Sequence, residues 1–241
     1  MTNGGVSNYN AVQLSLEKRL SHGVTFVANY TRSKSLDNQS TDQQFSLSSP
    51  DPFDRAFNHG LSDFDTPNNF TLNGLWRLPK LQSGNTYLRA IVDGWGLTGI
   101  LTWRSGTPFS IVSGQDRSLS GIGLDRADLA GSPYLPARAT AQTIGEYFNT
   151  GAFTLNAPST FGTAPRNLLR NPVHFDLDMG VQRNFSLGEN RRLQFRAEAF
   201  NLPNNAHFNQ PGNNVSSANT FGRITSTGNP RILQLVGRFE F

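Results

Sequence analysis

Residues 48–65 hold the densest group of side chains that could do chemistry, in the stretch SSPDPFDRAFNHGLSDFD. Its titratable or charged members are Asp51, Asp54, Arg55, His59, Asp63 and Asp65. Carboxylate oxygens at this spacing could hold Ca²⁺. The Asp-x-Asp-x-Asp-Gly pattern of a calcium-binding loop is missing, however, and aspartates in loops commonly cap turns. We therefore favour a loop whose aspartates cap turns and pair with Arg55, and we predict no metal site.

A second group lies in VHFDLDMGVQRNF, where His174, Asp176 and Asp178 would share one face of a strand. Their spacing would also suit a metal ion. Glu198 with either aspartate could act as the acid and base of a glycosidase. The alternative is the polar interior of a barrel, where Arg192 and Arg196 would pair with these carboxylates across strands. We favour that alternative.

Motifs of known catalytic chemistry are missing from the rest of the chain. There is no Gly-x-Ser-x-Gly, no His-Glu-x-x-His and no phosphate-binding loop. We therefore predict that the protein is not an enzyme, with no catalytic residue and no cofactor.

The amino-acid composition excludes further classes of site and of protein. The 241 residues include no cysteine, which excludes disulfides and thiolate metal sites. Net charge is +4, but the basic residues are scattered, so no stripe indicates nucleic-acid binding. Apolar residues make up only 36%, and no run approaches the roughly 20 that a membrane helix needs. Any membrane crossing would therefore use strands.

Seven segments alternate between apolar and polar residues, as half-buried strands do. For example, Phe70, Leu72 and Trp76 alternate with Thr71 and Asn73. The predicted strands span residues 9–20, 24–33, 68–79, 92–105, 173–186, 191–201 and 231–241. This predicts an all-β protein, an antiparallel up-and-down meander of about seven to eight long strands.

The connections alternate between short and long. Short connections are predicted at 21–23, 80–92 and 186–190. The long ones, at 33–67, 106–171 and 203–229, are rich in Gly, Pro, Asn, Ser and Asp. Because they occupy every second connection, all three would emerge from the same end of the meander. A compact soluble domain rarely holds several loops of this length.

Transmembrane β-barrels combine these features: apolar-out and polar-in strands of about 10 residues, short periplasmic turns and long extracellular loops. Aromatic residues near the strand ends would form the interfacial girdles of such a barrel; they are Tyr30, Trp76, Trp95, Trp103 and Phe185. A soluble β-sandwich, such as a carbohydrate-binding module, would give the same alternation and stays open as the alternative.

The last strand, ILQLVGRFEF, ends on Phe241. It resembles the C-terminal signal by which the barrel assembly machinery recognises bacterial outer-membrane proteins. The resemblance assigns that role to Leu235, Gly237, Phe239 and Phe241. The partners it implies are this machinery and outer-membrane lipid, in a Gram-negative bacterium.

Longer blocks extend the resemblance from about residue 8 onward. They are SDFDTPNNFTLNGLWRLP, GWGLTGILTWRSGTPFSI, RNLLRNPVHFDLDMGVQRNFSLGENRRLQFRAEAFNLPNNAHF and FGRITSTGNPRILQLVGRFEF. Together they resemble the C-terminal barrel of TonB-dependent receptors, in particular the Oar-like acidobacterial group with a carboxypeptidase-regulatory-like domain. This resemblance implies a barrel of about 22 strands around a plug. It also implies energy-coupled uptake of a siderophore, glycan or peptide.

Against that pattern, the chain shows no signal peptide, TonB-contacting box or plug. We therefore expect residues 1–241 to be the C-terminal part of a receptor, either a gene fragment or a mis-assigned start. Contact with the TonB complex would then run through the missing N-terminal part. Possible ligand contacts in the loops are Asp54, Arg55, Arg104, Arg117 and Arg126, with Arg166 and Arg170 as further arginines suited to an anionic ligand.

Overall fold

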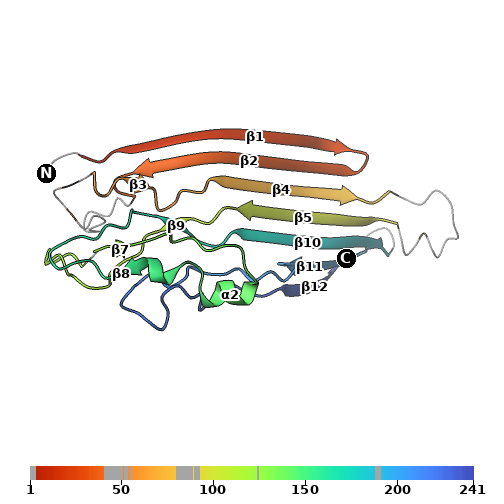
Figure 1. Ribbon diagram of the computed structural model, residues 1–241. Helices are drawn as coiled ribbons and strands as arrows, with labels where there is room; N and C mark the ends of the chain where they lie inside the picture. The colour runs from red at the N-terminus through yellow and green to blue at the C-terminus, as the bar shows by residue number, and fades with distance from the viewer. Residues whose placement is uncertain are drawn as a thin grey trace.

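A computed structural model describes residues 4–40, 51, 54, 56–79, 89, 93–123, 125–187 and 191–241. Its main feature is one twisted antiparallel sheet whose long strands follow each other in chain order (Figure 1). These strands are β1 (Ser7–Ser21), β2 (Val24–Asp37), β4 (Asn68–Arg77), β5 (Trp95–Arg104), β10 (His174–Ser186), β11 (Arg192–Phe200) and β12 (Ile232–Glu240). The predicted all-β meander is confirmed.

The strands differ from the predicted bounds by up to four residues at either end. β2 continues to Asp37, four residues past the predicted end, because Leu36 and Asp37 pair with the short strand β3 (Gly60–Leu61). The sheet does not close: β1 and β12 form its two edges. Because all neighbours are antiparallel, these two edge strands run in the same direction.

The connection between β1 and β2 is a two-residue turn at His22 and Gly23. Both residues have positive φ, 52° and 78°, as the type I′ hairpin turn requires. A Cβ on Gly23 would stand 2.4 Å from the Arg77 carbonyl oxygen, so glycine is required here. The predicted connection 80–92 and residues 188–190 of the predicted connection 186–190 lie largely outside the described residues.

Strand register aligns most apolar residues of the seven strands on one side of the sheet, which we call the apolar face. One row across it pairs aromatic residues on four successive strands: Tyr30, Phe70, Trp103 and Phe175. At the other end, Trp95 aligns with Arg183, whose guanidinium lies 5.6 Å from the Trp95 ring. Trp103 and Trp95 are eight positions apart on β5, roughly 27 Å at about 3.4 Å per residue. At a strand tilt of about 35–45° this separation spans roughly 19–22 Å along the membrane normal, somewhat less than the apolar band of about 25 Å.

The apolar face is uncovered along the described chain. Trp76 and Phe195 on it are 45% and 38% exposed. The described elements form one eight-stranded sheet, counting β3, and two sheets of two short strands, so no second large sheet covers this face. The β-sandwich alternative, which needs two sheets packed face to face, is therefore wrong. Among the described residues, no helix is long and apolar enough to span a membrane.

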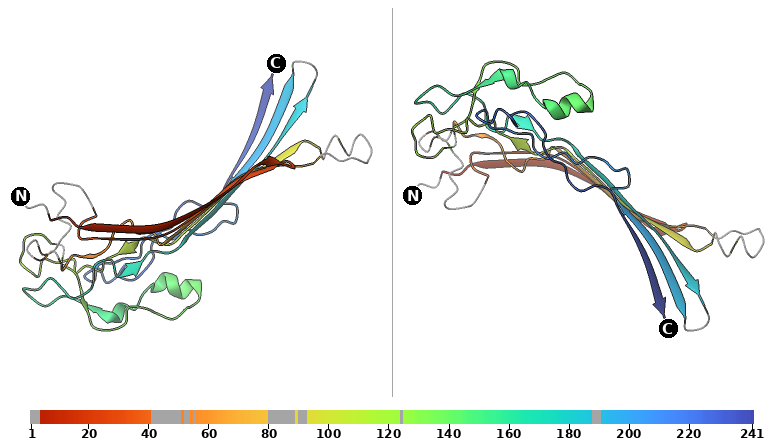
Figure 2. Two further views of the ribbon diagram at one scale, coloured as in Figure 1. Left: turned by 90° about the horizontal axis from the view of Figure 1, so that it is seen from above. Right: turned by 90° about the horizontal axis from the view of Figure 1, so that it is seen from below.

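The long connections fold together at one end and against one side of the sheet (Figure 2). We call the described residues 56–67, 105–123, 125–173 and 201–231 the loop module. Its short elements are β6 (Pro108–Phe109), β7 (Asp128–Leu129), α2 (Thr140–Gly145), η1 (Thr150–Ala152), β8 (Phe153–Thr154) and β9 (Leu169–Arg170). Segments far apart in sequence pair here, β6 with β9 and β7 with β8.

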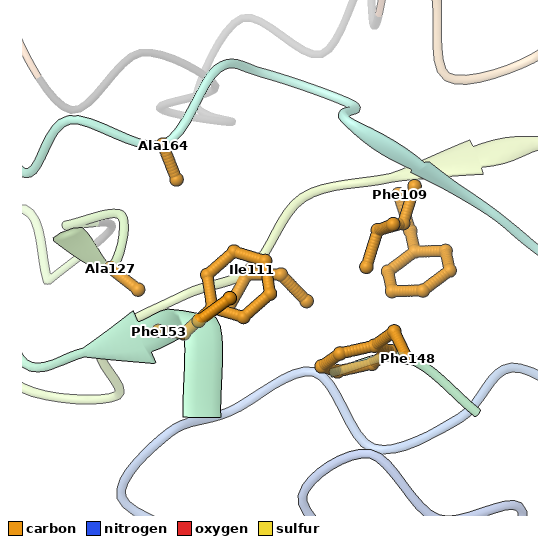
Figure 3. Packing of buried hydrophobic residues seen from close by; sticks show 8 residues of the cluster. Phe109, Ile111, Ala127, Phe148, Phe153 and Ala164 are labelled. Carbon is orange, nitrogen blue, oxygen red and sulfur yellow. The ribbon is translucent and has the colours of Figure 1, made fainter. Parts of the chain in front are cut away.

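The loop module has its own hydrophobic core, shown in Figure 3. Its buried residues are Phe109, Ile111, Ala127, Phe148, Ala152, Phe153, Ala164 and Leu169. Phe148 is central: its ring centroid lies 6.2 Å from that of Phe109 and 5.6 Å from that of Phe153. The sequence predicted long polar loops here and gave no sign of this core.

Candidate ligand-binding face

The side of the sheet opposite the apolar face carries the polar residues of the strands, and we call it the polar face. Ser35 and Asp37 of β2 lie on it and are buried beneath the loop module. The module therefore covers the polar face at the end where the long connections lie. The other end carries the short His22–Gly23 turn.

Strand register orders the polar face into rows across the sheet. One row, level with the aromatic row on the other face, consists of Gln13, Thr31, Asn69, Arg104 and His174. The next row toward the short turns consists of Ser15, Asn29, Thr71, Thr102 and Asp176. In it the Ser15 hydroxyl donates to Asn29 Oδ1 at 2.8 Å. In these two rows, hydroxyl, amide and charged groups thus stand opposite the aromatic and aliphatic side chains of the other face.

The carboxylates considered as a metal or catalytic group have separate partners. Asp178 accepts a hydrogen bond from the backbone N–H of Asn201 at 2.8 Å. Glu198 pairs with Arg196 of its own strand at 3.2 Å. His207 Nε2 lies 3.8 Å from Asp176 Oδ1, and its ring packs against that of His174 at a tilt of 40°, with centroids 4.5 Å apart. Within the part of the chain that the structure describes, no three His, Asp or Glu side chains are grouped so as to hold a metal ion.

Arg166 joins the loop module to the sheet. Its guanidinium donates to Asp37 Oδ1 at 2.5 Å and to Asp63 Oδ1 at 3.0 Å, and the whole residue is buried. Beside it, Arg170 pairs with the buried carboxylate of Asp65 at 2.5 Å. Both arginines, predicted as contacts for an anionic ligand, are therefore occupied by internal carboxylates. Sequence spacing could not indicate the Arg166–Asp37 pair, because 129 positions separate the two residues.

Arg126 and Arg117 also have partners inside the module. The Arg126 guanidinium lies 3.8 Å from the centroid of the Phe57 ring and donates to the Phe57 carbonyl at 2.8 Å. Burial, and then the nearby positive charge of Arg166, lower the pKa of Arg126 to about 10. Arg117 donates to the Asn156 carbonyl at 2.5 Å. Arg126 is 4% exposed, so its guanidinium supports the fold of the loop module and is not accessible to a ligand.

The other predicted contacts are placed differently. Asp54 accepts hydrogen bonds from the backbone of Ala56 and Phe57 at 2.9 and 3.2 Å, the turn-capping arrangement favoured for this loop. Arg55 lies outside the described residues. Arg104 is exposed on the polar face, in line with Asn69 and His174. Its role as a ligand contact stays a prediction.

The residues of the predicted assembly signal lie on or after the edge strand β12. Leu235 and Phe239 project from the apolar face and are 73% and 52% exposed. Gly237 pairs with Phe195 between them, and Phe241 follows the strand. Their role in assembly stays a prediction.

The model of a family described as an outer membrane beta barrel domain matches residues 1–234. No curated protein and no solved structure matches the chain.

Proposed function

Because the chain belongs to the outer membrane beta barrel domain family, we propose that it forms part of the wall of a TonB-dependent receptor of the Oar-like type. Its place is the outer membrane of the cell, where the apolar face meets lipid. In this proposal the polar face lines the lumen, and the loop module stands at the extracellular mouth. The receptor takes up a ligand at the expense of energy relayed from the inner membrane.

One observation carries the proposal: a folded module is anchored over one end of the polar face by buried ion pairs. Long extracellular loops are general in transmembrane β-barrels and do not by themselves indicate uptake. Here the connections between strands instead form a core of their own and bind the sheet through Arg166 and Arg170. Such a module presents a fixed surface at the mouth, as selective uptake requires. The sequence blocks that resemble TonB-dependent receptors support the same proposal.

The proposal is tested by uptake into whole cells. A strain deleted for the gene and the same strain carrying it are compared for uptake of radiolabelled neutral oligosaccharides, ferric siderophores and short peptides. We expect saturable uptake of one class that depends on the gene, and that is lost with a protonophore or without TonB.

Two results contradict it. Gene-dependent uptake that is unchanged by the protonophore and by loss of TonB would identify a passive channel instead. Equal uptake of all three classes by the two strains would mean that the protein does not transport these ligands.

A further inference from the structure

Phe64 is an exposed aromatic ring on a backbone that is otherwise tightly fixed. The residue is 61% exposed, whereas Ser62 and Asp65 on either side of it are fully buried. The Ser62 N–H donates to the Ser35 carbonyl at 3.0 Å, and Asp65 Oδ1 accepts from the Ser35 N–H at 2.6 Å. An apolar ring exposed to water costs free energy. The fixed backbone does not offset this cost, because it gives the ring no packing contacts. Such pre-organisation is typical of a group that meets a ligand.

A hollow of about 360 Å³ opens beside this ring on the polar face. Its floor is formed by β1, β2 and β4, and its lining includes Tyr9, which is 59% exposed. Tyr9 aligns with Ser35, so its side chain stands on the polar face as well. Two aromatic side chains with accessible surface therefore line one hollow.

Three polar side chains cross the floor of the hollow in a single row. Gln13 aligns with Thr31, and Thr31 aligns with Asn69. Within the described part of the chain, none of the three side chains has a hydrogen-bond partner. Directly aligned side chains on neighbouring strands stand about 4.5–5.5 Å apart, comparable to the length of one pyranose ring. Each amide and hydroxyl can both donate and accept.

The charges of the hollow are already neutralised. Its one carboxylate, Asp65, is 1% exposed and pairs with Arg170 at 2.5 Å. No lysine or arginine is among its lining residues. The exposed Arg104 is a neighbour of the hollow rather than part of its lining, since it aligns with Asn69 on the β5 side. An anionic ligand would therefore find no cation within the lining, and a purely apolar ligand would strip water from three unpaired polar side chains.

An extended peptide is recognised mainly through the backbone of a sheet edge. Here the backbone groups of β2 beside the hollow are occupied. Ser33 N donates to the Pro67 carbonyl, Ser35 N donates to Asp65 Oδ1, and the Ser35 carbonyl accepts from Ser62 N. The lining favours a neutral ligand with many hydroxyl groups and flat C–H faces. We propose that this hollow is a binding subsite for a neutral oligosaccharide, with Phe64 and Tyr9 stacking on sugar rings and with Gln13, Thr31 and Asn69 binding hydroxyl groups.

This inference rests on the proposed function only in that the polar face must line a water-filled lumen. Binding is therefore measured without transport, in outer-membrane vesicles that carry the full protein. The probes are fluorescently labelled maltohexaose, cellohexaose and xylohexaose, with a neutral tripeptide and a ferric catecholate as ligands of other classes. We expect saturable binding of at least one hexasaccharide and of neither other probe.

Variants then locate the binding. Phe64→Ala and Gln13→Ala should each weaken it about tenfold, the scale of a central contact. The matched controls are Tyr134→Ala, which removes an exposed aromatic of the loop module, and Gln234→Ala, which removes an amide from the polar face of β12. Neither should change the affinity more than about twofold. Heat-modifiable migration on gels verifies that each variant is folded.

The subsite is refuted if no hexasaccharide binds the vesicles. It is also refuted if Phe64→Ala and Gln13→Ala bind the hexasaccharide as tightly as the unmodified protein does. Binding of the peptide or the ferric probe instead of a hexasaccharide, with the same dependence on Phe64 and Gln13, is the third contradicting result. Uptake separates this from the proposed function. Binding that depends on Phe64, in cells without protonophore-sensitive uptake, leaves the subsite standing and removes the transport role. Protonophore-sensitive uptake that neither Phe64→Ala nor Gln13→Ala changes leaves the transport role standing and removes the subsite.

Discussion

Phe148 in the loop module is 2% exposed, whereas Leu235 on β12 is 73% exposed, although each lies within a continuous apolar group. In the module, aromatic rings from distant segments bury one another and exclude water. On the sheet, register aligns apolar side chains into one face that no described element covers. An apolar side chain exposed in the loop module would face water, whereas one exposed on the sheet faces lipid, because lipid surrounds the apolar face. The predictions below test this difference, beginning with the largest effect.

Phe148→Ala should open the loop module without preventing membrane assembly. Removing a buried phenylalanine costs about 3–5 kcal/mol, and this ring packs against Phe109, Phe153 and Phe221. We expect trypsin added to intact cells to cleave the module much faster, while heat-modifiable migration of the barrel is retained. Tyr134→Ala is the control, since that ring is exposed. If migration is lost together with protease resistance, the two regions do not fold independently.

Arg166→Ala should detach the module from the sheet. It leaves Asp37 buried without its arginine, and breaking a buried pair in this way costs about 3–5 kcal/mol. The measurement is again trypsin cleavage on intact cells, and Asp37→Asn in the same chain should restore part of the resistance. Arg138→Ala breaks a more exposed pair with Glu146 and should cost at most about 1 kcal/mol. An equal effect of the two arginine substitutions would refute the anchoring role of Arg166.

Leu101→Arg should lower the yield of folded protein in the outer membrane. Leu101 stands on the apolar face between Leu72 and Leu177, where an arginine facing lipid costs about 2–4 kcal/mol near the middle of the bilayer. Thr102→Arg is the matched control, one position along on the polar face. The folded fraction is read from heat-modifiable migration. A lower yield for Thr102→Arg than for Leu101→Arg would reverse the assignment of the two faces.

Ser15→Ala should have the smallest effect. It removes the hydrogen bond from the Ser15 hydroxyl to Asn29 at 2.8 Å, worth about 0.5–1.5 kcal/mol. The midpoint of urea unfolding in lipid vesicles should fall slightly. Gln13→Ala, on the same face of the same strand but without a partner, should leave the midpoint unchanged. Equal shifts would mean that the Ser15–Asn29 bond adds nothing to the polar face.

The strands could be predicted because their signal is local. The alternation of Phe70, Leu72 and Trp76 with Thr71 and Asn73 places β4 within two residues of its observed end. The same phase predicted which side chains share a face, and the register confirms it for Leu72, Leu101 and Leu177. Alternation with a period of two needs no knowledge of distant residues.

The loop module could not be predicted because its contacts have no period. Phe109, Phe148 and Phe221 belong to segments far apart in the chain, and nothing in their spacing brings them together. The sequence alone identifies the arginines only as positive charges. Whether an arginine is open to a ligand or buried against a carboxylate, as Arg166 is against Asp37, depends on pairing between segments far apart in the chain. The polar row at Gln13, Thr31 and Asn69 needed the register, which alternation alone does not fix.

The common direction of β1 and β12 limits how such a wall can be completed. Rotation about the membrane normal keeps every strand pointing the same way, so a β1 edge brought against the β12 edge of a second copy would meet it in parallel. Bacterial single-chain outer-membrane barrels are antiparallel throughout and have an even number of strands. The sheet has seven long strands, so a closed antiparallel barrel built on it needs an odd number of additional strands. The first and the last of these additional strands must both run opposite to β1.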